Sequence, residues 1–176
     1  MRILKRIGIA LAALIALVLI VAAFVPKVYT VSVTQHIKAP QETVFLYLSK
    51  FANQKQYSIW MKMDPALQET ITGKDGQLGA IQTWDSKVDD VGAGEQEIIE
   101  INSEKIKVEI RFKRPFEGKL LTSTTCKPVG AETDVTIEFT SESNYPMNLP
   151  SYLFGKSYME KSISTNLQNV KQILEN

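Results

Sequence analysis

Cysteine and histidine are almost absent from this 176-residue sequence, which contains one of each. Cys126 has no partner for an intramolecular disulfide, so a packed core must hold the fold. It falls in a strand-like stretch, and we expect it to be a small buried residue because Lys127 alone gives little support for a reactive thiol. One histidine, no second cysteine and no HExxH-type spacing argue against a transition-metal site, and we expect neither metal nor cofactor.

The sequence also lacks the short motifs of several enzyme classes. It contains no GxSxG nucleophile motif, no phosphate-binding glycine loop and no dinucleotide fingerprint. Gly92-Ala93-Gly94 is better explained as a hairpin turn, because no helix follows it to present N–H groups to a phosphate. No motif therefore identifies a substrate.

An excess of charge of one sign is missing as well. The 20 Lys and Arg residues nearly balance the 19 Asp and Glu residues, and 17 basic residues remain once Arg2, Lys5 and Arg6 at the N-terminus are set aside. Nucleic-acid binding normally requires a concentrated basic surface. We expect no nucleic-acid partner, and we expect a monomer.

One long hydrophobic run lies between Arg6 and Lys27. From Ile7 to Val25 it contains only Gly, Ala, Val, Ile, Leu and Phe, and a helix of that length spans nearly the roughly 30 Å of a bilayer's hydrocarbon core. Three basic residues precede the run and one follows it closely. The positive-inside bias then leaves the N-terminus in the cytoplasm and places the rest on the extracytoplasmic side, the periplasm in a cell with an outer membrane.

A cleaved signal peptide is the alternative explanation of this run. Val21-Ala22-Ala23 offers small residues to a signal peptidase, although the run is longer than a usual h-region. We favour a retained anchor, with residues 1–27 as the cytoplasmic end and transmembrane helix and residues 28–176 as one folded domain. Cleavage would instead give a secreted or periplasmic protein, so both alternatives export the domain.

Beyond the run, hydrophobic and polar residues alternate in seven segments. The clearest is 105–113, in which Ile106, Val108, Ile110 and Phe112 share one face and charged residues share the other. Strands with one apolar face predict an antiparallel sheet that is covered on one side only. The expected strands are 28–37, 67–72, 80–85, 94–101, 105–113, 118–127 and 132–140.

Helices are predicted in three places. Pro40 can open a short helix, because its missing N–H costs nothing in a first turn. Residues 53–65 are irregular or contain a second short helix. From Pro150 to about Glu175, apolar residues recur at spacings of three, four and seven. The expected fold is therefore α+β, with a curled sheet closed around one long C-terminal helix.

Several short sequence words accompany this order of elements. They are Ile37-Lys38-Ala39-Pro40, Tyr57-Ser58-Ile59-Trp60, Lys62-Met63-Asp64-Pro65, Lys113-Arg114-Pro115-Phe116 and Tyr145-Pro146-Met147-Asn148-Leu149. With them, residues 28–176 resemble the superfamily of START-related, polyketide-cyclase/dehydrase-like and lipid-transport proteins (SRPBCC), in particular its bacterial, membrane-anchored branch. That resemblance implies the helix-grip fold of the birch-pollen allergen and a hydrophobic cavity between sheet and last helix.

Side chains on the elements that would border such a cavity are the candidate ligand-binding residues. Methionine adapts to irregular apolar ligands, and Trp or Tyr can add one oriented hydrogen bond. Trp60 is expected to pack beneath its loop and shape one end of the cavity. A fully packed core is the alternative, since periodicity does not distinguish a filled interior from a hollow one. The candidates are Trp60, Met63, Trp84, Val108, Ile110, Phe112, Phe116, Ile137, Tyr152, Met159 and Ile163.

Few residues suit acid–base catalysis. His36 falls on the polar face of the first strand, and Glu95 and Glu97 share the face opposite Ile98, so we expect all three at the surface. We therefore favour non-catalytic binding of a hydrophobic small molecule or lipid. The alternatives are a cyclase or dehydratase with an acid or base in the cavity, as the resemblance allows, and an interaction module of the cell envelope.

Overall fold

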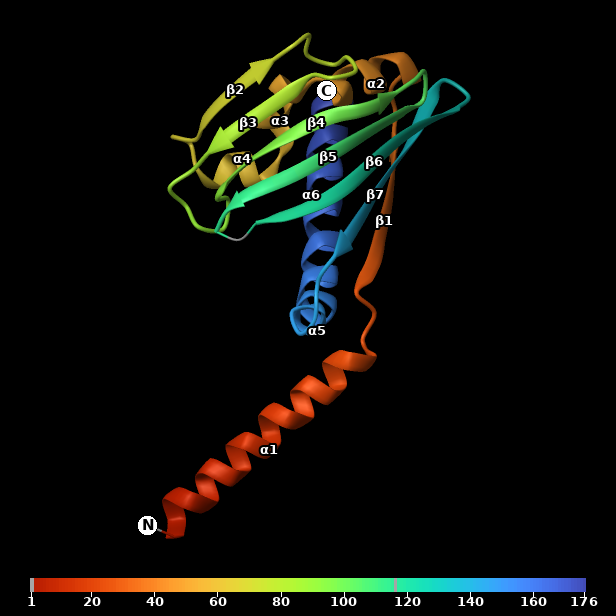
Figure 1. Cartoon of the computed structure of the whole chain (residues 1–176). Coiled ribbons are helices and arrows are strands. Elements are labelled where there is room, and N and C mark those ends of the chain that lie inside the picture. Colours follow the sequence, from red (N-terminus) through yellow and green to blue (C-terminus); the bar gives the residue numbers. More distant parts are fainter. Residues whose placement is uncertain (1, 116) are drawn as a thin grey trace.

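The computed structural model describes residues 2–115 and 117–176, which form an N-terminal helix and an α+β domain (Figure 1). The helical segments are α1 (Arg2–Phe24), α2 (Gln41–Ser49), the 3-10 turn η1 (Phe51–Asn53), α3 (Gln54–Tyr57), α4 (Ile59–Met63), α5 (Asn148–Pro150), the π-helical turn η2 (Ser151–Gly155) and α6 (Lys156–Leu174). The strands are β1 (Val28–Ile37), β2 (Gln68–Thr72), β3 (Ile81–Asp85), β4 (Ala93–Ile101), β5 (Lys105–Arg114), β6 (Gly118–Val129) and β7 (Glu132–Glu142).

The seven strands form one antiparallel sheet in the order β1-β7-β6-β5-β4-β3-β2. The first strand therefore pairs with the last, with Val28 opposite Glu142 and Ile37 opposite Thr133. β4 shifts register against β5 between Ile98 and Glu100, an irregularity of the kind that bends a strand and increases its twist. The predicted seven-stranded antiparallel sheet is confirmed.

The long helix α6 lies across the concave face of the sheet (Figure 1). Ile163, Leu167 and Val170 are buried at spacings of four and three, which places them on one side of the helix. They share a core cluster with residues of β1, β6 and β7, including Val31 and Val135. The predicted apolar stripe of the last helix therefore packs against one half of the sheet.

The short helices cover the other half. Phe51 of η1 is buried in a second core cluster with Ile98 of β4 and Ile106 of β5. The backbone N–H of Phe51 donates a hydrogen bond to the Asp75 carboxylate at 2.8 Å, which ties η1 to the loop between β2 and β3. Two separate clusters, one under α6 and one under η1, therefore hold the two sides of the sheet.

The last helix differs from its prediction at its start. It begins with α5 at Asn148, before Pro150, and passes through the wide turn η2 before α6. Gly155 ends η2 close to β1, where a Cβ atom would lie 2.8 Å from the hydroxyl oxygen of Tyr29. The wide turn and the missing side chain let the chain approach β1 closely, and periodicity alone does not signal such a turn.

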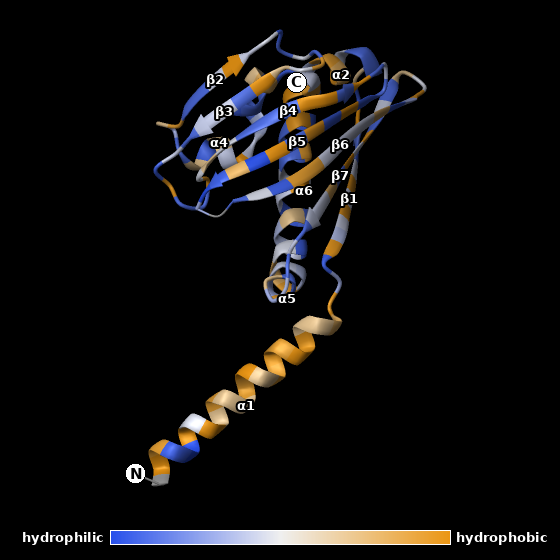
Figure 2. Ribbon diagram, viewed as in Figure 1, coloured by the Kyte–Doolittle hydropathy of each residue, from blue (hydrophilic) through white to orange (hydrophobic). Residues whose placement is uncertain are grey.

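The burial predicted for Cys126 is confirmed, and α1 has the length and composition predicted for the hydrophobic run. Cys126 is fully buried, and burial raises the pKa of its thiol to about 12, as expected for a small core residue. The span Ile3–Phe24 is long and apolar enough to cross a membrane or to serve as a signal sequence. Figure 2 shows that hydrophobic residues occupy nearly all of α1 beyond its N-terminal end.

The central position of Leu167 can be tested against its neighbour. Leu167→Ala should lower the free energy of unfolding by about 2–5 kcal/mol, because the cavity left in a packed core adds to the lost transfer energy. Gln168→Ala, an exposed change one position along α6, should stay within about 0.5 kcal/mol of the parent. Chemical denaturation of the full chain in mild detergent measures both, and equal effects would contradict the assigned core.

Candidate ligand cavity

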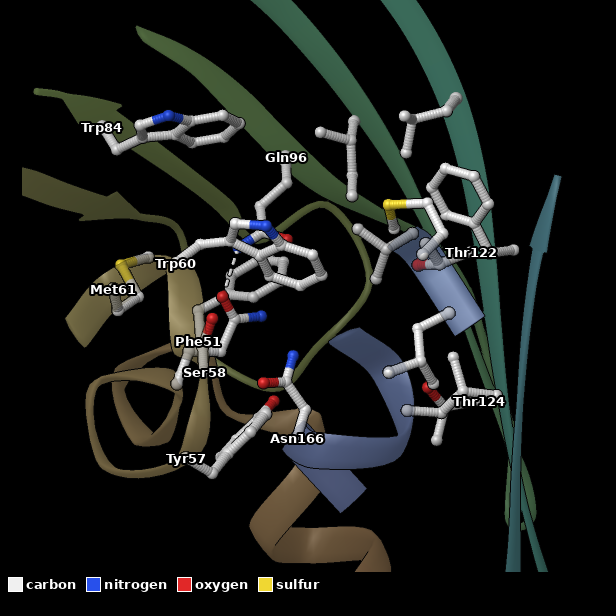
Figure 3. Close-up of a pocket in the computed structure, with 18 of the residues that line it drawn as sticks. Phe51, Tyr57, Ser58, Trp60, Met61, Trp84, Gln96, Thr122, Thr124 and Asn166 are labelled. Atoms are coloured by element: carbon white, nitrogen blue, oxygen red, sulfur yellow. Dashed lines mark hydrogen bonds between the residues drawn. The ribbon is translucent and has the colours of Figure 1, made fainter. Parts of the chain in front are cut away.

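A cavity of about 350 Å³ lies between the inner face of the sheet, α6 and the short helices, and is partly open to solvent. Ligand sites commonly measure roughly 300–1,000 Å³, so the space suits a small organic molecule. Its lining is mainly apolar and includes residues of both core clusters, such as Phe51 and Phe139. Figure 3 shows aromatic, aliphatic and amide side chains directed into it. The interior of the domain is therefore hollow where the two clusters meet.

Eight of the eleven candidate residues line this cavity. Val108, Ile110 and Phe112 alternate along β5, so their common face follows from the pleat. Trp60 is half-buried and forms part of the wall contributed by α4. The eight residues are Trp60, Trp84, Val108, Ile110, Phe112, Ile137, Met159 and Ile163.

The other three candidates are placed differently. Met63 is the last residue of α4 and is 43% exposed, away from the lining. Tyr152 lies in η2 and packs edge-on against Tyr29, with ring centroids 6.1 Å apart, rather than against the cavity. Phe116 lies outside the described residues. Met63 and Tyr152 both lie near the ends of helical segments, where neither the helical nor the strand period predicts the direction of a side chain.

Trp84 forms a rigid part of the wall. Its indole N–H donates to the carbonyl oxygen of Val91 at 3.2 Å, and its ring packs edge-on against Phe112 at 5.8 Å. Gly94 lies opposite Trp84 in the neighbouring strand, and a Cβ at this glycine would come within 2.7 Å of the indole. The missing side chain at Gly94 therefore makes room for the ring to lie flat on the sheet.

One end of the cavity is polar, a feature that hydrophobic periodicity does not predict. Gln54, Gln96 and Asn166 all line it, and Gln96 and Asn166 are buried. A signal for Gln96 was present, because alternation in β4 puts it on the same inner face as Gly94 and Ile98. A polar residue at a core-facing strand position must find hydrogen-bond partners.

These partners form a chain of side chains along the inner face of the neighbouring strands β4, β3 and β2. Gln82 donates from Nε2 to Glu69 Oε2 at 2.8 Å, and Lys55 Nζ lies 2.7 Å from the other Glu69 oxygen. Gln96 in turn donates from Nε2 to Gln82 Oε1 and, at 2.8 Å, to Gln54 Oε1. The charged pair stays outside the cavity, and only neutral amides reach its wall.

The helices α3 and α4 are held against α6 by two asparagines. Asn166 accepts a hydrogen bond from the backbone N–H of Ile59 at 2.9 Å, and Asn169 donates to the carbonyl oxygen of Tyr57 at 2.8 Å. Tyr57 itself is buried, and this burial raises the pKa of its phenol well above the usual range. The phenol is therefore neutral at physiological pH.

Charged side chains gather on the outer face of the sheet. Arg111 bonds to Glu95 at 2.8 Å, to Glu97 at 2.9 Å and to Glu109 at 2.7 Å. Hydrogen bonds from Lys113 and then Arg111 lower the pKa of Glu95. The surface placement predicted for Glu95 and Glu97 is confirmed. Among the described lining residues, Asp90 carries the one charged side chain, and it is exposed at the rim.

His36 also lies away from the cavity. Its Nδ1 is 2.7 Å from Asp134 and its Nε2 is 2.5 Å from Glu132, both on the paired strand β7. The hydrogen bond with Asp134, followed by that with Glu132, raises the pKa of His36 above its usual value of about 6.5. The expected surface position is confirmed, and the histidine is held by two carboxylates there.

The comparison with protein families yields one match. The family described as "Polyketide cyclase / dehydrase and lipid transport" matches residues 29–175, which is nearly the whole of the α+β domain. No curated protein sequence matches the chain.

Solved structures share the fold at low sequence identity. Protein MLL2253 from Mesorhizobium loti aligns with a TM-score of 0.61 at 14% identity, covering 84% of this chain and 97% of its own. Ara h 8.0201 gives 0.59 at 15%, covering 85% and 99%. A protein of the dynemicin biosynthetic locus, DynU16, gives 0.60 at 13%, covering 84% of this chain and 47% of its own. At such identities the likeness shows the fold alone.

The His36 cluster allows a titration test, because the chain contains a single histidine. Its imidazole should titrate above pH 6.5 in NMR spectra of the full chain, and Asp134→Asn should lower that pKa. Glu138→Gln, an exposed change on the same strand, should leave it unchanged. Because the folded-state pKa is raised, the stabilisation is fully present below the unfolded value and is lost as the pH rises through the folded value. A pKa at or below 6.5 would contradict the two-carboxylate arrangement.

Proposed function

Because the chain belongs to the polyketide cyclase/dehydrase and lipid transport family, we propose that it binds a hydrophobic small molecule or lipid in the cavity between sheet and α6, while α1 anchors it in a membrane. The domain then lies on the extracytoplasmic side, as the basic residues before the apolar run favour. The observation that carries the proposal is the mainly apolar cavity of about 350 Å³.

The cavity wall can bind a ligand by burying its apolar surface. Aromatic rings from three elements, Trp60, Trp84 and Phe112, offer a large contact area to an apolar ligand. Each Å² of apolar surface removed from water contributes roughly 25 cal/mol, so a ligand that fills the space gains several kcal/mol before any polar contact. Met61 and Met159 add adaptable contacts at the opening and along α6.

Retention of α1 is supported by a contact between the helix and the domain. Asn148 is buried, and its Nδ2 donates to the carbonyl oxygens of Ala22 at 2.7 Å and Val25 at 2.8 Å. Ala22 is only 1% exposed. Cleavage after Ala23 would remove one of these two acceptors and leave a buried amide N–H unsatisfied, which costs free energy. The contact therefore favours an anchor over a cleaved signal peptide.

The catalytic alternative has less support. A cyclase or dehydratase needs an acid or base that reaches the substrate. Among the described lining residues only Asp90 has a carboxylate, and none has an imidazole or an amine; Asp90 lies at the exposed rim. The neutral amides of the polar end can orient a ligand but do not exchange protons readily.

Filling the cavity tests the binding proposal. Thr122 and Thr124 of β6 line the space, so the alternating Thr125 lies on the other face. Thr122→Phe should weaken binding of a neutral apolar probe, N-phenyl-1-naphthylamine, at least tenfold because the added ring occupies its place. Thr125→Phe is the matched control and should change affinity less than twofold.

The two tryptophans of the chain, Trp60 and Trp84, report on this binding because both line the cavity. Their fluorescence should change on addition of the probe to the full chain held in an amphipathic polymer. Equal affinities for the two phenylalanine variants, with both folded, would show that the probe binds elsewhere and would contradict the proposal.

A further inference from the structure

The polar end of the cavity includes Gln96 Oε1 and Asn166 Nδ2, two atoms for which no described residue supplies a hydrogen-bond partner. Gln96 and Asn166 are only 7% and 6% exposed, yet each uses just one side of its amide within the protein. Figure 3 shows Gln96 extending down from the sheet and Asn166 extending up from α6 into the same space. A ligand that excludes solvent from this end of the cavity must pair with these atoms, since leaving a buried polar group unpaired costs about 1–3 kcal/mol.

The chemistry of the chain fixes which atom of Gln96 remains free. A carboxylate only accepts hydrogen bonds, so Gln82 must turn its NH₂ group toward Glu69 and its oxygen toward Gln96. Gln96 must then donate from Nε2, and its second N–H is taken by Gln54. Glu69 thereby orients Gln96 from a distance, and the atom left for a ligand is the acceptor Oε1.

Asn166 supplies the opposite kind of group. Its Oδ1 accepts the backbone N–H of Ile59, which leaves the two N–H bonds of Nδ2 directed toward the cavity. Gln96 and Asn166 therefore offer one acceptor and one donor to a ligand. A hydroxyl group suits both, because it donates one hydrogen bond and accepts others.

The charge of the lining limits the ligand further. No described lining residue is Lys, Arg or His, and the exposed Asp90 would repel an anion. Burying a carboxylate or phosphate without a cationic partner is very costly, whereas a neutral hydroxyl loses little once it is hydrogen-bonded. An anionic headgroup is therefore a poor match to this end of the cavity.

We propose that the cavity selects a neutral apolar ligand that carries a hydroxyl group, the hydroxyl donating to Gln96 Oε1 and accepting from Asn166 Nδ2. This assignment rests on the proposed function and narrows its ligand class. Glu69 and Gln82 act as positioning residues, because they fix the orientation of the Gln96 amide without touching the ligand.

Three probes with the same ring system separate the effects of apolar contact, a hydroxyl group and a negative charge. They are naphthalene, 2-naphthol and 2-naphthoate. Calorimetry on the full chain should show 2-naphthol binding at least tenfold more tightly than the other two. Gln96→Leu should reduce the preference for 2-naphthol over naphthalene to about twofold or less. Asn166→Asp, which keeps an acceptor for the Ile59 N–H but removes the donor, should do the same. Unchanged naphthalene affinity shows in each case that the cavity is intact.

The outcomes distinguish this inference from the proposed function. Equal binding of naphthalene and 2-naphthol by the parent chain would overturn the hydroxyl assignment while leaving an apolar cavity. Tightest binding of 2-naphthoate would overturn it as well, because it would require a cation. Binding of none of the three probes would overturn the proposed function itself.

A second inference concerns the segment that holds the end of α1. Asn148 bonds to Ala22, which lies inside the apolar run, so α5 must sit at the level of the membrane surface if α1 spans the bilayer. The same segment exposes Met147, Leu153 and Phe154, the last by 71%. Exposed apolar side chains at this depth are typical of contact with the interfacial region of a bilayer.

We infer that Met147, Leu153 and Phe154 insert into the lipid interface and hold the domain against the membrane. This inference also rests on the proposed anchor. Figure 1 places α5 at the end of the domain next to α1, whereas the β2–β3 loop, with the 66% exposed Leu78, lies at the opposite end. The two ends therefore provide a test site and a control site.

Single labelling positions are available because the only native cysteine, Cys126, is buried. With the full chain in phospholipid nanodiscs, an environment-sensitive fluorophore at Phe154→Cys should emit at shorter wavelength and be quenched at least threefold more strongly by nitroxide lipids than one at Leu78→Cys. Equal quenching would overturn the docking surface. A mature chain that begins at Phe24, found by intact mass, would overturn the anchor and the docking surface together.

Discussion

The apolar inner face of a seven-stranded sheet has to be covered, and the chain has one long helix with which to cover it. The stripe of Ile163, Leu167 and Val170 on α6 covers the side formed by β1, β6 and β7. The other side is covered by short helical segments that lie over β4 and β5, with Phe51 as their buried residue. Where the two covers meet, the interior is not filled and is partly open to solvent. The cavity and the function proposed for it depend on this incomplete coverage.

Most charged side chains lie outside the cavity lining. Arg111 and its glutamate partners occupy the outer face of the sheet, where they stay near water because burying ionised groups costs more than a single partner returns. Glu69 of the edge strand β2 lies on the inner face instead, and its side chain, only 10% exposed, is compensated by Lys55 of α3 and by Gln82. Through the hydrogen bonds of Gln82 and Gln96, the Glu69 carboxylate fixes the orientation of the Gln96 amide, although its charge stays outside the cavity lining. A polar but uncharged end in an apolar cavity is the result.

Much of the fold could be predicted because alternation is a strong signal in strands of this length. Along β5 the pleat alone decided that Val108 and Ile110 face inward, and both line the cavity. The helical period is less informative at helix ends, and Met63 and Tyr152, which it predicts in the cavity lining, lie elsewhere. The sequence likewise could not indicate that Arg111 lies beside Glu95, since that pairing depends on the register between β4 and β5. Periodicity does not place the start of the last helix at Asn148, because the contact of Asn148 with Ala22 joins segments far apart in the sequence.

The polar end shows the limit of reasoning from residue type. Gln96 stands at an inward-facing position, yet its role depends on Gln82 and Glu69, which belong to other strands.

The central claim, a cavity occupied by a hydrophobic ligand, is tested most directly by native mass spectrometry of the full chain purified from the membranes of its own cell. The account predicts a bound, uncharged molecule that fits a space of about 350 Å³ and that is lost from Thr122→Phe but kept by Thr125→Phe. Equal occupancy of the two variants, or a chain that always emerges without a ligand, would contradict it.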